Sequence, residues 1–268
     1  MKKNVVLTIA VIAFATCTIV LGVMLWQSKT SEDDTVSKGN YSDDMKIPYT
    51  VDLSTEDGAD SVERDGDHED SVYFSTIDFY NLEATDTLTM LTKFKTYQQT
   101  SEWSCGVAAA LMVLDYYGKL DDWNEETLAD LRSDHSEIHP GTCLIQMQDI
   151  FDGVGGFTYE STDDYVDNME EIDLSLIRSY LEDGVPVLIA WNDWGGHWQA
   201  IIGYDDMGTE TESDDVIIVA DPYDTTDHNQ DGYGVYGAER FYYNFTMYGF
   251  FGEDELNDMV FLAVKPSE

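Results

Sequence analysis

Two segments at the start of the chain limit where a folded domain can form. Lys2 and Lys3 precede an uncharged apolar run that extends from Val5 to Trp26. The segment from Ser28 to about Ser71 is rich in Asp, Glu, Ser, Thr and Gly, and its like charges repel one another. Such a composition cannot build a core. We therefore predict a disordered acidic linker over residues 28–71 and a folded domain over residues 72–268.

The apolar run has the length of a membrane anchor. At about 1.5 Å rise per residue, a helix over residues 5–26 reaches roughly the 30 Å thickness of a bilayer core. Ala13-Phe14-Ala15 has the small-x-small spacing of a signal-peptidase site but lies in the middle of the run. We predict an uncleaved signal anchor and transmembrane helix over residues 1–27, and a secreted protein if this segment is cleaved. The lysines should stay in the cytoplasm, which makes the chain a single-pass protein of the cell membrane with its domain outside.

The charge of the chain excludes one class of partner. Its 54 Asp and Glu residues against 13 Lys and Arg residues give a formal net charge of −41. Such a surface repels phosphate backbones, so we expect no nucleic-acid partner. It favours cationic substrates, although a well-solvated acidic surface is the simpler interpretation.

Helical patterns precede strand patterns in the part of the chain that can fold. The predicted helices cover residues 104–117, 124–131, 143–151 and 174–181, and the predicted strands cover 186–191, 197–204, 216–220 and 259–264. Helices followed by antiparallel strands indicate an α+β domain.

The segment from Gln99 to Ala110 places Cys105 at the start of a helix of small and apolar residues. Unpaired N–H groups and the positive end of the helix dipole stabilise a thiolate at that position. Gly106 leaves the sulfur uncrowded. Gln99, six residues earlier, can direct its amide to the same point and form an oxyanion hole with the Cys105 N–H. The competing interpretation of Cys105 is a buried small hydrophobe.

A histidine and an aspartate lie at the ends of two predicted strands. His197 follows Gly195-Gly196 and opens an apolar run, and Asp221 ends the run from Val216 to Ala220. Direct pairing of His197 with Asp221 in an antiparallel hairpin places the turn at Met207-Gly208-Thr209. Directly opposed residues share a face, so Asp221 can orient the His197 ring. A histidine held by a carboxylate is the base that a cysteine nucleophile needs.

The order Gln99, Cys105, His197, Asp221 resembles that of papain-like cysteine peptidases. More narrowly, the chain is similar to the bacterial branch that includes the peptidases trimming double-glycine leaders from bacteriocin precursors, and their stand-alone relatives. The resemblance covers about residues 87–266. It implies a papain-like fold, with Cys105 as nucleophile, His197 as base, Asp221 as orienting residue and Gln99 as oxyanion donor. A domain outside the cytoplasm would be on the opposite side from the usual leader processing, so the resemblance implies peptidase chemistry rather than that substrate.

The expected activity is hydrolysis of a peptide or protein substrate without a cofactor. One alternative is a thiol-dependent transpeptidase or acyltransferase that passes the acyl group to an amine. The other is a catalytically silent surface binding module of the same fold.

Two weaker patterns remain open. Asp227, Asn229 and Asp231 have the spacing of the first half of a calcium loop, but Ala238 stands where the twelfth ligand belongs. A structural Ca²⁺ competes here with an Asp-Gly turn in an acidic protein. Trp191, Trp194 and Trp198 surround the histidine and line either a substrate cleft or the core.

Overall fold

The computed structural model describes residues 40–41, 77–101, 103–133, 141–193, 196–223, 231–247, 249, 251 and 255–267. The chain divides into two units, residues 1–36 and 37–268, and every described residue belongs to the second. The predicted signal anchor therefore lies outside the described residues, as does the predicted linker apart from strand β1 (Asn40–Tyr41). Across the described ranges, no helix has both the length and the apolar character that crossing a bilayer requires.

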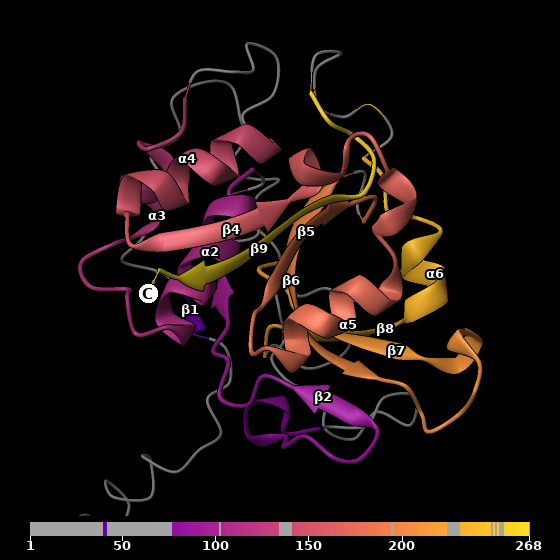
Figure 1. Ribbon diagram of the computed structural model, residues 1–268. Coiled ribbons are helices and arrows are strands. Elements are labelled where there is room, and N and C mark those ends of the chain that lie inside the picture. The colour runs from indigo at the N-terminus through magenta and orange to yellow at the C-terminus, as the bar shows by residue number, and fades with distance from the viewer. Residues whose placement is uncertain are drawn as a thin grey trace, which may run out of the picture. The chain divides into compact units, whose positions relative to one another are not determined.

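An antiparallel sheet is the framework of the second unit (Figure 1). Its strands follow the order β4-β9-β5-β6-β7-β8, and β2 pairs with β6 in addition. The bounds are β2 Leu88–Met90, β4 Phe157–Ser161, β5 Val187–Trp191, β6 His197–Asp205, β7 Val216–Ala220, β8 Tyr233–Gly237 and β9 Val260–Pro266. A separate parallel pair joins β1 to β3 (Tyr97–Gln98).

The helices cover different parts of this sheet. Their bounds are α2 Cys105–Tyr116, α3 Glu125–Ala129, α4 Leu144–Val154, α5 Leu174–Glu182 and α6 Ala238–Tyr242. Short 3-10 helices cover Phe79–Asn81, Thr162–Tyr165, Met169–Glu171 and Glu212–Asp214. Helix α2 packs against β6, α4 packs against β4 and β9, and α6 packs against β7 and β8 (Figure 1).

Burial explains why α2 and the central strands form where they do. Every residue of α2 from Cys105 to Leu114 is buried, as expected for a helix that is apolar on all sides. All of β5 is buried, and so is β6 except for its last residue. Continuous apolar runs of this kind are typical of strands that are covered on both faces. Cys105 and His197 thus begin two elements that belong to the core.

The prediction of an α+β domain is confirmed, and the main helices and central strands lie where the sequence pattern placed them. The pattern missed the short strands β2 and β3, and it also missed β4 and β8. Strand β4 is the polar outer strand of the sheet, and its burial is only partial. Strand β8 contains Gly234 and Gly237, which carry no strand signal. Both strands form because neighbouring strands supply the backbone partners.

The predicted register between β6 and β7 is wrong by two residues. Ala200 pairs with Ala220 and Ile201 with Val219, so the register carries Asp221 opposite position 199 rather than 197. A bulge between Ile201 and Gly203 adds a further shift toward the turn. The connection also contains the 3-10 helix Glu212–Asp214, so it is longer than a tight turn. Because side chains alternate with a period of two, a shift of two residues preserves the face.

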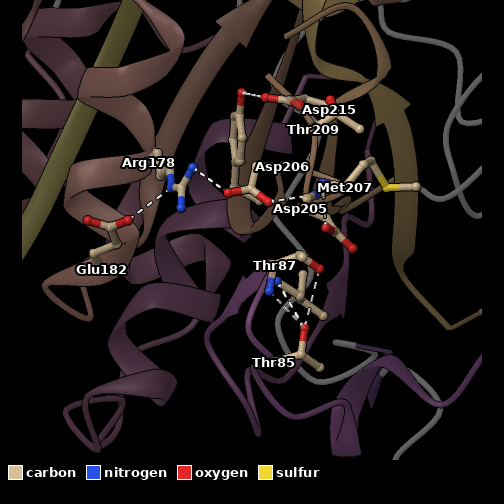
Figure 2. A network of polar contacts seen from close by, with 12 residues as sticks. Thr85, Thr87, Arg178, Glu182, Asp205, Asp206, Met207, Thr209 and Asp215 are labelled. Carbon is tan, nitrogen blue, oxygen red and sulfur yellow. Dashed lines mark hydrogen bonds and ion pairs between the residues drawn. The ribbon is translucent and has the colours of Figure 1, made fainter. Parts of the chain in front are cut away.

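Polar contacts hold this connection to α5, as Figure 2 shows. Arg178 of α5 lies between Glu182 and Asp206, with a distance of 2.8 Å from its Nη1 to Asp206 Oδ2. At the base of the connection, the Tyr204 hydroxyl donates to Asp215. Within the turn, the Met207 N–H donates to Asp205 Oδ1 at 2.8 Å. These contacts fix the end of the hairpin that is far from His197.

Gly232, directly before β8, supports the end of β7, because its carbonyl accepts the Asp221 N–H at 2.8 Å. Its φ is +76°, and an added Cβ would lie 2.5 Å from the Thr96 Cβ. Gly184 is a matched control, with φ +75° and no neighbouring atom within 4 Å of an added Cβ.

We expect Gly184→Ala to lower the free energy of unfolding by about 1–2 kcal/mol, the cost of the left-handed conformation alone. Gly232→Ala should lower it by about 1–3 kcal/mol more, because the clash with Thr96 is added. Urea denaturation of both variants measures the difference. Equal losses would show that Thr96 does not restrict position 232.

Candidate active site

Cys105 is the first residue of α2, and its side chain is a buried free thiol. The helix begins because the Ser104 carbonyl accepts the Ala108 N–H at 2.9 Å. N–H groups in the first turn of a helix lack partners within the helix, and the dipole adds positive potential there. Cys105 therefore lies where a helix start offers both unpaired N–H groups and positive potential.

Gly106 allows the segment before α4 to approach the start of α2. An added Cβ at Gly106 would lie 2.8 Å from the Thr142 Cβ. The Thr142 carbonyl in turn accepts the indole N–H of Trp198 at 2.6 Å. Thr142 therefore links the residue after Cys105 to the residue after His197. This close packing fixes the distance between the two elements that carry the site.

Gln99 lies in a loop that folds back before Cys105. Its backbone N–H donates to the Pro222 carbonyl at 2.8 Å, and its Nε2 donates to the Ser101 carbonyl at 2.6 Å. The Ser101 hydroxyl donates to Ser104 Oγ at 2.9 Å, which closes the loop against the N-cap of α2. The structure thus connects Gln99 to both the Cys105 helix and the end of β7.

A buried carboxylate secures the same loop. Glu125, in the first turn of α3, accepts the Thr100 N–H at 3.1 Å and the Thr100 hydroxyl at 2.9 Å. Its side chain is fully buried. Breaking such a pair on one side leaves a buried charge without its donors and is strongly unfavourable. Glu125 therefore holds the backbone directly after Gln99 in one conformation.

His197 stands at the start of β6 with its ring between Asp221 and Cys105. Its Nε2 lies 2.7 Å from Asp221 Oδ1, and the Cys105 side chain lies close enough to His197 to raise its pKa. Because a carboxylate only accepts, Nε2 carries a proton, and Nδ1 is the nitrogen left for the sulfur. Gly196, with φ +128°, provides the backbone conformation that turns the chain into β6.

Asp221 follows the last residue of β7, and both of its carboxylate oxygens accept hydrogen bonds. Oδ1 accepts from His197 and from the Tyr223 N–H, each at 2.7 Å. Oδ2 accepts from Gln199 Nε2 at 2.9 Å. Donors on a carboxylate favour its charged form. The predicted contact between His197 and Asp221 is therefore present, although the two residues are not directly paired.

Charge and burial act on His197 in opposite directions. Burial lowers the pKa of His197, but the Asp221 carboxylate and the Cys105 side chain outweigh it, so the pKa is raised above its ordinary value of 6.5. The folded protein thus favours the imidazolium at neutral pH. An imidazolium beside a sulfur stabilises the thiolate, which is the reactive form of cysteine.

Arg132 gives the sulfur a further cationic neighbour. Burial lowers the pKa of Arg132, and the electrostatic interactions with Cys105 and Cys143 oppose this effect. The guanidinium lies over the Trp103 ring, 5.0 Å from its centroid, and donates to Thr142 Oγ1 at 3.0 Å. These contacts hold the charge near Cys105.

The candidate calcium ligands are only partly described. Asp227 and Asn229 lie outside the described residues. Asp231 accepts the Tyr233 N–H at 3.1 Å, as an aspartate in a turn does. Within the described ranges, no cluster of three His, Cys, Asp or Glu side chains is arranged to hold a metal ion. The calcium interpretation stays a prediction.

Two of the three tryptophans belong to the core. Trp191 and Trp198 are 5% and 1% exposed, and both indole N–H groups have buried acceptors. Of the two alternatives, a substrate cleft or the core, the structure therefore favours the core for Trp191 and Trp198. Trp194 lies outside the described residues.

An α+β domain with a cysteine at a helix start, a histidine at a strand start and a carboxylate behind the histidine has the construction of a papain-like cysteine peptidase. Comparison with known families agrees with this class. The model of the Peptidase_C39 like family matches residues 91–250, so the chain belongs to this family. The match spans Gln99, Cys105, His197 and Asp221. No curated protein matches the chain.

Sequence reasoning missed Gln199, Glu125 and Arg132. Gln199 carried a usable signal, because a polar residue inside the apolar run of β6 must find buried partners. Glu125 and Arg132 carried none, since a glutamate in the first turn of a helix and an arginine after it are ordinary surface residues.

We expect Asp221→Asn to lower the pKa of His197 by about 1–3 pH units, because the neighbouring negative charge is lost while burial remains. Titration of the imidazole C–H signal by NMR measures this change. The signal is assigned among the five histidines by its absence in His197→Gln. Asp183→Asn, an exposed change of the same charge, is the control. Equal titration in both variants would contradict the role of Asp221.

Proposed function

We propose that this protein is a cysteine peptidase that hydrolyses peptide bonds, with Cys105 as nucleophile and His197 as base and acid. Asp221 orients His197, and Gln99 stabilises the oxyanion. The proposal rests on one observation, the series of contacts from the Cys105 side chain through the His197 ring to the Asp221 carboxylate. Membership of the Peptidase_C39 like family supports a peptide or protein as the substrate.

The proposed reaction follows a set order of proton transfers. The Cys105 thiolate attacks the carbonyl carbon of the peptide bond, and His197 Nδ1–H gives its proton to the leaving amine as the C–N bond breaks. Neutral His197 then takes a proton from water, and the water oxygen attacks the thioester carbonyl carbon. The C–S bond breaks, which releases the carboxylic acid product and restores the Cys105 thiolate. The proton on Nε2 stays with His197 throughout, because Asp221 stabilises the imidazolium without being protonated.

Gln99 has one amide N–H to offer to the oxyanion. Nε2 carries two hydrogens, and one of them is directed to the Ser101 carbonyl. We propose that the second hydrogen donates to the negatively charged oxygen that develops on the substrate, together with the Cys105 N–H. The Pro222 carbonyl holds the Gln99 backbone and Glu125 holds the backbone of Thr100, so the amide needs little reorganisation during the reaction.

We also propose that the domain acts outside the cytoplasm, held to the membrane by residues 1–27. The support is the uncharged apolar run behind two lysines, followed by a long acidic segment. Protease accessibility of the domain in intact cells tests this topology. Protection of the domain until the cells are lysed would overturn it.

Cys105→Ala should reduce peptide cleavage by about 10³-fold or more, because the nucleophile is lost. Cys143→Ala is the matched control, since Cys143 is also buried and free but its thiol lies outside the contact series. Digestion of a peptide library by the full-length chain, followed by mass spectrometry, measures cleavage. Retained activity in Cys105→Ala would end this assignment. Transfer of the acyl group to an added amine in place of water would identify an acyltransferase.

Alkylation tests the same site without a substrate. Burial raises the pKa of the Cys143 thiol to about 11, so this residue is expected to react slowly. Iodoacetamide should modify Cys105 at least about tenfold faster than Cys143 at pH 7, because the His197 imidazolium lies beside Cys105 and the Cys143 thiol stays protonated. The modified peptides are separated and quantified by mass spectrometry. An unreactive Cys105 in the folded protein would indicate a silent binding module.

A further inference from the structure

A partly buried polar network lies behind Asp221, and Gln199 is its centre. Gln199 lies on β6, two residues after His197, and its side chain is fully buried. Its Oε1 accepts the Trp191 indole N–H at 2.7 Å. An indole N–H only donates, so this contact fixes which end of the amide is oxygen. The NH₂ group must therefore face the other way, toward the carboxylates.

The Gln199 amide bridges two acidic side chains. Its Nε2 donates to Asp221 Oδ2 at 2.9 Å and to Asp193 Oδ2 at 3.3 Å. Asp193 Oδ2 also accepts the Tyr236 hydroxyl at 2.8 Å. The Tyr236 ring packs edge-on against Trp191, with 5.1 Å between the centroids. Each donor in this network has an acceptor, and the geometry allows one arrangement of the amide.

Asp193 also shapes the turn that leads to His197. Its N–H donates to the Trp191 carbonyl at 2.8 Å, and its carbonyl accepts the Gly196 N–H at 2.9 Å. The backbone of Asp193 thus spans the turn between β5 and β6, while its side chain reaches the amide that holds Asp221. One residue connects the position of the histidine to the position of its carboxylate.

We infer that Gln199 and Asp193 are positioning residues of the site: Gln199 clamps Asp221 against His197, and Asp193 adds a second negative charge that stabilises the His197 imidazolium. The inference rests on the proposed function for its catalytic meaning and on the hydrogen bonds for its geometry. Gln199 acts through Asp221, and neither residue has to touch the substrate. A fixed carboxylate matters because misplacement of a catalytic group by about 1 Å can cost about 10²-fold in rate.

The charges around the two groups set the sign of the effect. His197 is faced by Asp221, Cys105 and the Tyr223 ring, and Asp193 is faced by Tyr236, Asp221 and His197. Burial raises the pKa of Asp193, and the Tyr236 hydroxyl and the imidazolium oppose this rise. Charged Asp193 attracts the imidazolium, so removal of its charge should lower the pKa of His197.

The test compares Asp193→Asn with Asp183→Asn in the full-length chain. NMR titration of the His197 C–H signal should show a pKa lower by about 0.5–1 pH unit in Asp193→Asn and no change in the exposed control. The alkaline limb of kcat/KM, on a peptide that the wild-type protein cleaves, should move in the same direction. An unchanged His197 titration in Asp193→Asn would overturn the electrostatic role. If this variant does not fold, Asp193→Ala removes the same charge and should lower the pKa of His197 in the same way; an unchanged pKa there would be equally decisive.

Gln199→Leu tests the clamp. It should lower kcat by about 10- to 100-fold with little change in KM, because Asp221 loses its fixed orientation while substrate binding is untouched. A loss of stability with wild-type kcat in the folded fraction would show a purely structural role and contradict the inference. The NMR titration can be measured without turnover. A changed His197 titration in Asp193→Asn, with no peptidase activity in the wild-type protein or any variant, would therefore end the proposed function but not this inference. Wild-type peptidase activity with unaffected variants would end this inference alone.

Discussion

The end of β7 is the point on which the site depends, because separate parts of the chain make hydrogen bonds there. The Asp221 N–H donates to Gly232, and the Pro222 carbonyl accepts from Gln99, so the strand end is fixed on both sides. The Asp221 carboxylate then holds the His197 ring at 2.7 Å. One strand end therefore positions the orienting carboxylate directly, the imidazole through it and the Gln99 loop beside it. A displacement of this backbone would disturb all three groups together.

The electrostatics of the site contrast with those of the whole chain. With a formal net charge of −41, the protein surrounds its sulfur with positive potential from three sources: a helix start, an imidazolium and the Arg132 guanidinium. Burial makes each of these interactions stronger than it would be in water. The acidic surface and the cationic site are compatible because distant, solvent-exposed charges are screened over about 8–10 Å, whereas contacts inside the domain are screened much less.

Periodic and local patterns could be predicted from the sequence, and pairings between distant segments could not. The apolar runs of α2, β5, β6 and β7 located those elements, and the small residues after Cys105 indicated the helix start. The register of β6 and β7 depended on the bulge after Ile201 and on the length of the connection, neither of which has a local signal. The contact between His197 and Asp221 was still predicted because an error of two residues keeps both side chains on one face. The wrong register also hid the contact of Gln199, because Gln199 rather than His197 is the residue that the true register carries opposite Asp221.

The contact between Gly106 and Thr142 has a consequence for how the site is lost when the protein unfolds. The sulfur belongs to a helix that is buried from Cys105 to Leu114. The space between this helix and the segment before α4 is too small for even one added methyl group at Gly106. Fraying of surface loops therefore leaves Cys105 in place, and its environment is lost only when the core itself opens. Loss of this environment on heating should accordingly coincide with cooperative unfolding of the whole domain.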